Sequence, residues 1–405
     1  MKTSPRKLGV RDCRSRLLYE KEGRVYDRER FTFNGVANPA RSHPDENRSF
    51  YMSGVALSAE TSIDRYLARR RKHYWLLAVT TFLTLLSLIV DISIGPGQYS
   101  LTEIFAAIVS PEEVPRALSV IIWEIRLPVA LMAIVVGMSL AAAGAEMQTI
   151  LNNPLADPFT LGVSAAASFG AALAIVLGVG LFPGAEELLT TLNAFIMSMI
   201  ASLLIWLVSR MRGVSVQTMV LMGIALMFFF NAMLGILQYV ASAESLQQLV
   251  FWSLGSLSRA SWPKVGIATL ALLITLPVFI SAGWRLTALR MGDLQARALG
   301  VNVARLRLLV LLCSSLLAAT AVAFVGTIGF IGLVGPHIAR LLVGEDQKIF
   351  LPMSALTGAF LMSLTSIVSK TLIPGVLLPV GIITALIGLP FFISLILRSR
   401  REMWG

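Results

Sequence analysis

The sequence predicts an all-α protein that crosses a membrane about ten times. Of its 405 residues, 56% are hydrophobic and only 14% are charged, and the mean hydropathy is +0.75. A water-soluble chain of this length needs far more charge to cover its surface. The charges are also uneven, because residues 1–73 are dense in charged side chains and most of the remainder is apolar. We therefore expect a polar, basic N-terminal extension, 1–73, and a transmembrane domain, 74–400.

The transmembrane domain divides into apolar stretches of the length that a helix needs to cross a bilayer, about 20 residues. We expect ten segments, at 74–94, 127–150, 160–182, 188–209, 217–240, 264–284, 306–327, 332–343, 352–373 and 379–397. The turn-forming stretch NNPLADPFTLGVS joins the second segment to the third. Asp157 within it is expected to cap the start of the third segment.

The eighth segment belongs to the stretch GTIGFIGLVGPHIARLLVGED, residues 326–346, with a glycine at every third position at its start. This pattern predicts a break on the outer side and not a continuous helix, with neighbouring helices covering the irregular backbone. Pro336 is expected to start the short helix that follows. His337 is expected to be a packed polar group and not a ligand.

Lys and Arg in the short loops predict the orientation. If the N-terminus is cytoplasmic, the inner loops hold most of the basic residues. The outer loops then hold Arg116, Arg126, Arg259, Lys264 and Lys370. Both termini are therefore expected to be cytoplasmic, which agrees with an even number of helices. The net charge of +11 then reflects a basic cytoplasmic face and not a nucleic-acid partner.

The extension shows no sustained periodicity over residues 24–50, which predicts loop or disorder. Its first residues lack the apolar core of a signal peptide. Residues 60–72, ETSIDRYLARRRK, are compatible with a short basic helix on the membrane surface. One alternative stays open, in which Met52 is the true start and residues 1–51 are not made.

The chain carries no motif of covalent, metal or nucleotide chemistry. The phosphate loop, the zinc-protease helix, the paired cysteines and the nucleophile elbow are all absent from the sequence. We expect no catalytic residue and no metal or cofactor bound by this chain. Glu146 is expected to be an end-of-helix carboxylate bonded to neighbouring backbone. The alternative is an ion-coupling group of a stand-alone secondary carrier.

Three stretches together resemble the FecCD-type permease subunits of bacterial importers for iron-siderophores, haem and cobalamin. They are residues 123–173, beginning WEIRLPVALM; residues 292–307, GDLQARALGVNVARLR; and residues 377–397, LLPVGIITALIGLPFFISLIL. The resemblance covers residues 74–400 and implies the cobalamin-permease-like fold of type II ABC importers, in the bacterial inner membrane. It also implies a second copy of the chain, two ATP-binding subunits that carry Mg-ATP, and a periplasmic binding protein. A ferric-siderophore chelate is the expected cargo; haem, cobalamin and pairing with a paralogue stay open.

Residues 285–307 form the longest expected cytoplasmic loop. Leu294, Ala298 and Leu299 lie along one apolar edge, and Gly300 is expected to end that short helix. A compact protrusion of this kind can seat in a groove on a partner. In the resembling family this loop couples the permease to its ATPase. The resemblance therefore implies a coupling role for Gly292, Asp293, Leu294, Arg297, Ala298, Leu299, Gly300 and Val301.

Two cations at the outer rim match positions whose arginines, in the cobalamin permeases of that family, pair with acids on the binding protein. They are Arg126 and Lys370, and the resemblance implies that they dock the binding protein. The chain departs from the family pattern at Val129 and Leu378, where the family often has Arg and Glu, so docking would depend on fewer charges. The alternative is that both cations extend to the lipid headgroups.

The fifth segment, VQTMVLMGIALMFFFNAMLGILQYV, is expected to line the transport pathway. Its methionines, Met219 among them, are soft and adaptable, and Asn231 is its one strongly polar interior group. Val216 and Gln217 match the cytoplasmic gate of the cobalamin permeases in the resembling family. Ordinary helix packing is the alternative for each methionine.

Overall fold

The computed structural model describes residues 44–95, 97, 99–180, 186–212, 215–373 and 375–403, and every regular element in these ranges is a helix. The chain divides into two units, Met1–Leu67 and Ala68–Gly405. Helix α1, Pro44–Ser93, belongs to both. It begins inside the stretch expected to be loop and includes residues 60–72, so the basic helix is continuous with the first span. The expectations for residues 1–43 lie outside the described residues, and the division at residue 73 stays a prediction.

Among the described residues, seven helical stretches are long and apolar enough to cross a membrane. They are Leu67–Ser93 of α1; Arg116–Ile150, which joins α3 (Arg116–Val120), the π-helical turn η1 (Ile121–Arg126) and α4 (Leu127–Ile150); Leu188–Val208 of α6 (Glu186–Arg212); α7 (Val216–Val240); α9 (Trp262–Arg290); α11 (Val303–Val325); and α13 (Gln347–Thr371). Three shorter apolar helices are α5 (Val163–Leu177), α12 (Ile331–Val343) and Val380–Ile393 of α14 (Val380–Met403). Each lies at one of the ten predicted segments, so the all-α, ten-helix prediction is confirmed.

The structure adds short helices that the sequence analysis missed. They are α2 (Leu101–Val109) and α8 (Ala243–Ser253), with the 3-10 turns η2 (Pro158–Leu161) and η3 (Leu257–Arg259). Asp157 caps η2, where its Oδ1 accepts from the backbone N–H of Phe159 at 3.1 Å. The expected cap is therefore present, but it lies one element before α5.

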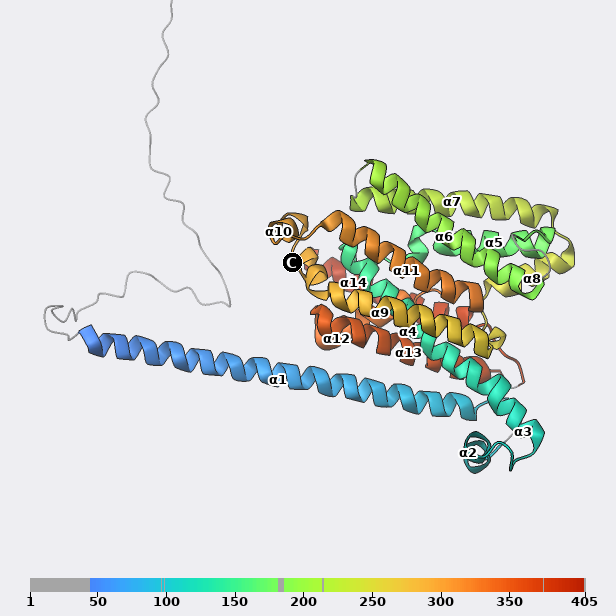
Figure 1. Ribbon diagram of the computed structural model, residues 1–405, viewed down its shortest axis with the longest axis horizontal. Helices are drawn as coiled ribbons and strands as arrows, with labels where there is room; N and C mark the ends of the chain where they lie inside the picture. The colour runs from blue at the N-terminus through green and yellow to red at the C-terminus, as the bar shows by residue number, and fades with distance from the viewer. Residues whose placement is uncertain are drawn as a thin grey trace, which may run out of the picture. The chain divides into compact units, whose positions relative to one another are not determined.

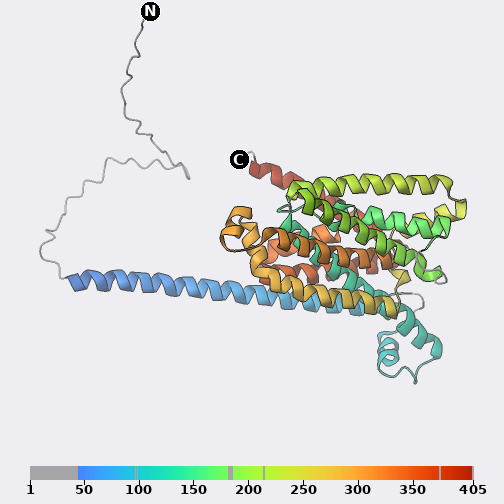
Figure 2. The same cartoon turned by 45° about the horizontal axis from the view of Figure 1, so that its top comes forward.

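Helix α4 occupies the middle of the second unit and packs against α9, α11, α12 and α13 (Figures 1 and 2). Nearly all of its side chains are buried. At Gly137 and Gly144 the backbone of a neighbouring helix comes so close that an added Cβ would overlap Gly358 of α13 and Gly332 of α12, respectively. Glycines permit this approach because they have no side chain.

The glycine-rich stretch is broken as predicted. Helix α11 ends before Gly326, whose φ is 79°, and α12 starts after Phe330, whose φ is 69°. The connection between α8 and η3 covers the break. The backbone N–H of Ser256 donates to the carbonyl of Val325 at 2.6 Å, and the Thr327 hydroxyl donates to the carbonyl of Ser253.

The prediction that Pro336 starts the short helix is wrong, because α12 begins five residues earlier, at Ile331. A proline inside a helix cannot donate to the carbonyl four residues before it, which here belongs to Gly332. A side chain of α4 supplies the donor instead, since Nε2 of Gln148 lies 3.3 Å from the Gly332 oxygen. The replacement donor explains how Pro336 sits inside α12.

Candidate functional site

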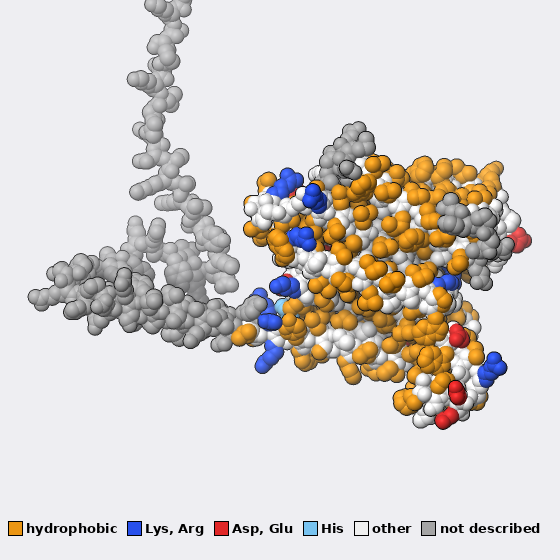
Figure 3. Space-filling model, viewed as in Figure 1, with side chains coloured by type: hydrophobic (Ala, Val, Ile, Leu, Met, Phe, Trp, Pro, Cys, Tyr) orange, Lys and Arg blue, Asp and Glu red, His pale blue; other side chains and the backbone are white. Residues whose placement is uncertain are grey.

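Lys and Arg side chains gather at one end of the second unit, over the end that carries α10, Asp293–Ala298 (Figure 3). Most Asp and Glu side chains visible in this view lie toward the other end. We call the end with α10 the cationic end. The sequence-based orientation assigns this end to the cytoplasm.

Helix α10 is a short protrusion between two glycines with left-handed backbone, Gly292 at φ 109° and Gly300 at φ 81°. The prediction that Gly300 ends this helix is confirmed: its N–H donates to the Arg297 carbonyl at 2.9 Å. Leu294 is 81% exposed and Leu299 is 56% exposed. Of the remaining predicted coupling residues, Arg297, Ala298 and Gly300 are exposed, Gly292 and Asp293 are half-buried, and Val301 is buried.

Asp293 is held by a residue that sequence reasoning counted only as a loop charge. Arg307 forms a salt bridge with it at 2.8 Å, and Arg307 is 3% exposed. The two residues are fourteen positions apart, so local sequence patterns could not predict that they pair. One signal was available, since Arg307 begins an apolar run where a buried cation needs a partner.

Helix α7 presents a regular exposed stripe. Seven of its exposed residues recur three or four positions apart and form this stripe: Gln217, Leu221, Ile224, Phe228, Asn231, Gly235 and Gln238. Further exposed residues, Phe229, Ile236 and Tyr239 among them, lie beside the stripe. The predicted pathway residues divide over this helix. Gln217 and Asn231 lie on the stripe and Val216 is half-buried, whereas Met219 is fully buried and packs in the core.

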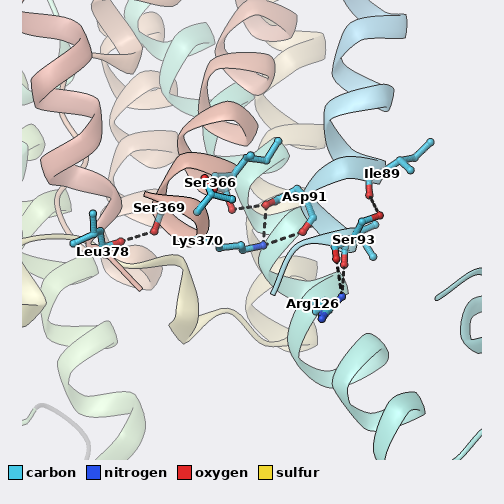
Figure 4. A network of polar contacts seen from close by, with 11 residues as sticks. Ile89, Asp91, Ser93, Arg126, Ser366, Ser369, Lys370 and Leu378 are labelled. Atoms are coloured by element: carbon cyan, nitrogen blue, oxygen red, sulfur yellow. Dashed lines mark hydrogen bonds and ion pairs between the residues drawn. The ribbon is translucent and has the colours of Figure 1, made fainter. Parts of the chain in front are cut away.

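At the end away from α10, Lys370 of α13 forms a salt bridge with Asp91 of α1 at 2.8 Å (Figure 4). Asp91 is 0% exposed, and Oγ of Ser366 also donates to its Oδ1 at 2.9 Å. The sequence analysis did not single out Asp91, although an acid at the end of an apolar run was a usable signal. The pair fastens α1 to α13.

Arg126 also donates hydrogen bonds at the end of α1. Its Nη1 donates to the carbonyls of Ile92 at 3.1 Å and Ser93 at 3.0 Å, and its Nη2 donates to Gly97 at 3.0 Å. Ile92 and Ser93 belong to the last turn of α1, where a helix lacks internal donors and favours a cation, and Gly97 follows the helix. Arg126 is 2% exposed.

Arg126 and Lys370 are therefore both engaged inside the chain in this structure. They line the same hollow, together with Ser256, Ser258 and Ser369. Docking of a binding protein there stays a prediction.

A polar cluster lies at the cationic end of α4. Glu146 is fully buried. The sequence analysis expected backbone groups to bond its carboxylate, but the donor is a side chain, Nε2 of Gln347, at 3.4 Å from Oε2 of Glu146. Arg340 donates to Oε1 of Gln148 at 3.0 Å and forms a salt bridge with Glu345 at 3.1 Å. The cluster connects α4 to α12 and α13.

His337 packs edge-on against Phe391, with ring centroids 5.3 Å apart.

The family model of the FecCD transport family matches residues 83–398, which include nearly all of the features described above. The chain belongs to the FecCD transport family. HmuU, the hemin transport system permease protein of Yersinia pestis, is 40% identical over 285 residues, 70% of this chain and 85% of that protein. MolB, the molybdate import system permease protein of Haemophilus influenzae, is 36% identical over 327 residues, 79% of this chain and 95% of that protein.

A solved structure described as an inward-facing metal-chelate type ABC transporter is also similar to this FecCD chain. It is 33% identical with a TM-score of 0.69, over 80% of this chain and 98% of that one. The chain is thus an ABC importer permease of the FecCD family with the type II importer fold, a multi-pass protein of the inner membrane. Membership favours this function over a stand-alone secondary carrier.

Proposed function

We propose that this FecCD permease carries a ferric-siderophore-type chelate from the periplasm to the cytoplasm, as one of two copies. ATP hydrolysis belongs to two separate ATP-binding subunits, which carry Mg-ATP and contact the cationic end. A periplasmic binding protein delivers the chelate at the opposite end.

The observation that carries the proposal is the apolar exposure of α10. Leu294 is 81% exposed and Leu299 is 56% exposed, at an end of the protein that is otherwise rich in cations. Leu294 and Leu299 are both exposed on one short helix outside the spans, and an apolar surface made by more than one large side chain supports a protein contact there. The Asp293–Arg307 salt bridge holds this surface in one orientation.

The stripe on α7 supports a second copy of the chain. Asn231 lies well inside the span and would face lipid in a lone subunit, where a polar group is expensive. Gln217 and Gln238 lie near the two ends of α7. An alternation of three and four residues is the spacing at which two helices pack side by side. A facing copy or a water-filled pathway between two copies satisfies these side chains. After removal of the native cysteines, Asn231→Cys is expected to form a disulfide between copies, whereas Leu270→Cys, exposed on α9, is not.

The cargo is proposed from the relatives and from the character of the stripe. Relatives are named for hemin, for molybdate, for Fe(3+)-citrate and for cobalamin. Between Gln217 and Asn231 the stripe is apolar, with Leu221, Ile224 and Phe228, and this part suits a bulky chelate better than a small oxyanion. Haem and cobalamin are the alternatives.

The experiment is uptake into liposomes that contain the permease with its ATP-binding subunit and its binding protein. Ferric siderophore, ferric citrate, hemin, cobalamin and molybdate are each supplied to the binding-protein side. ATP-dependent accumulation of a ferric chelate supports the proposal. Accumulation of hemin, cobalamin or molybdate alone reassigns the cargo, and accumulation without ATP refutes the coupling.

A further inference from the structure

Arg307 connects three helices at the cationic end. Its Nη1 donates to Oδ2 of Asp293 at 2.9 Å and its Nη2 to Oδ1 at 2.8 Å. Its Nε donates to the carbonyl oxygen of Ile150 at 3.1 Å. Asp293 is the first residue of α10 and Ile150 is the last of α4. A side chain of α11 therefore fastens the protrusion to the end of the central helix.

Each of these bonds depends on the guanidinium. The last carbonyls of a helix have no partner within it and favour a cation, and Nε of Arg307 supplies a donor to one of them. The remaining donors form a two-pronged contact with the Asp293 carboxylate, which a lysine cannot reproduce. Arg307 is 3% exposed, so its charge requires the counter-charge of Asp293.

The covalent connections of α10 are poorly suited to transmit a movement by themselves. Each passes through a glycine with left-handed backbone, Gly292 before the helix and Gly300 after it, and glycine rotates more freely than other residues. Arg307 bypasses both glycines. The element that it reaches, α4, is in backbone contact with α12 and α13 at Gly144 and Gly137. Closely packed helices of this kind shift as bodies and do not absorb a displacement.

We propose that Arg307 is a positioning residue that makes α10 and the end of α4 move as one body. A shift that an ATP-binding subunit imposes on α10 then reaches the middle of the helix bundle through α4. The inference rests on the proposed function, because it requires α10 to be the surface that this subunit moves.

The test uses the complete complex in liposomes. Arg307→Lys keeps the charge but loses the simultaneous contacts with Asp293 and Ile150, and Asp293→Asn removes the counter-charge. Arg305→Lys is the matched control, an exposed arginine two residues away. Cargo taken up per ATP hydrolysed is expected to fall about tenfold in both test variants, equivalent to about 1.4 kcal/mol of lost coupling, and to stay unchanged in the control. An unchanged ratio in an assembled test variant would overturn the inference.

A second readout separates coupling from folding. Amide hydrogen exchange at residues 147–151 is measured with and without a non-hydrolysable ATP analogue. The wild-type complex is expected to change exchange there on adding nucleotide, and the test variants are expected to show no change. A nucleotide response of wild-type size in Asp293→Asn would overturn the inference even where Arg307→Lys does not assemble. If the wild-type chain binds no ATP-binding subunit, the proposed function fails as well, whereas normal coupling in the variants defeats only the role of Arg307.

Discussion

The side chain of Gln148 replaces the hydrogen bond that Pro336 cannot make. Nε2 of Gln148 lies 3.3 Å from the carbonyl oxygen of Gly332, the oxygen that the missing N–H of residue 336 would otherwise reach. Gln148 also accepts from Arg340 at 3.0 Å. One amide of α4 thus supports both the first and the last turn of α12.

Gln148→Met is expected to destabilise the domain by about 1–3 kcal/mol, because it leaves a buried carbonyl without its donor. Pro336→Ala restores an N–H that can reach Gly332, so the same Gln148 substitution should cost less in that background. Unfolding in detergent of the four chains of this double-mutant cycle measures the coupling. Strictly additive effects would show that Gln148 and Pro336 are unrelated.

The close approach of α4 to α12 predicts that Gly144→Ala prevents normal packing, because its Cβ would overlap the backbone of Gly332. The expected loss is about 1–3 kcal/mol or failure to fold. Gly266→Ala is the control, an exposed helical glycine of α9 with no atom near the added Cβ, and it should be neutral or slightly stabilising. Thermal unfolding compares the two. Equal stability of Gly144→Ala and wild type would refute the contact.

The buried pair of Asp91 and Lys370 predicts a non-additive pattern. Lys370→Met leaves Asp91 buried without its counter-charge and should cost about 3–5 kcal/mol. Adding Asp91→Leu should recover most of that loss, because an apolar pair needs no counter-charge. Unfolding in detergent checks both chains, and no recovery in the double variant would contradict the pairing. The affinity of the binding protein for the same two chains tests the docking prediction. If the stable double variant binds it as tightly as wild type does, Lys370 has no part in docking.

The titration of Asp157 predicts a pH effect. Burial raises the pKa of Asp157 to about 7, opposed in part by the N–H of Phe159. The unfolded chain loses the same proton near pH 3.9, so the folded state binds more protons between about pH 4 and 7 and stability falls as pH rises through that range. Asp157→Asn keeps an acceptor for the cap and removes the titration. Its stability should decline less than that of wild type between about pH 5 and 8, and identical declines would contradict the raised pKa.

Sequence reasoning could predict the spans because hydropathy and length determine them. It could also predict the break near Gly326 and the end of α10 at Gly300, since these depend on local glycine chemistry. It missed α8, whose eleven residues fall below the length of a span, and it misplaced the start of α12. The internal partners of Lys370, Arg126 and Arg307 were also missed. Asp91 and Lys370, for example, are 279 positions apart, and only the packed bundle brings them together.

The coupling loop supplies a further expectation at Gly300, whose φ is 81°. Gly300→Val places a β-branched side chain in left-handed backbone, which costs about 1–2 kcal/mol, and should reorient the end of α10. Gly300→Asn tolerates that conformation better and is the matched control. Uptake per ATP in liposomes should fall in the valine variant and remain near wild type in the asparagine variant. Equal ratios in both would show that the conformation at Gly300 does not matter for coupling.

The most direct test of the central claim is the affinity of the ATP-binding subunit for the permease in lipid nanodiscs. Leu294→Glu places a charge on the exposed apolar edge of α10, and Ala304→Glu places the same charge on an exposed position of α11 nearby. The account predicts that the Leu294 variant binds the subunit at least about tenfold more weakly than wild type, while the Ala304 variant binds normally. Equal affinity of wild type and Leu294→Glu would contradict the claim that α10 is the surface through which ATP hydrolysis drives this permease.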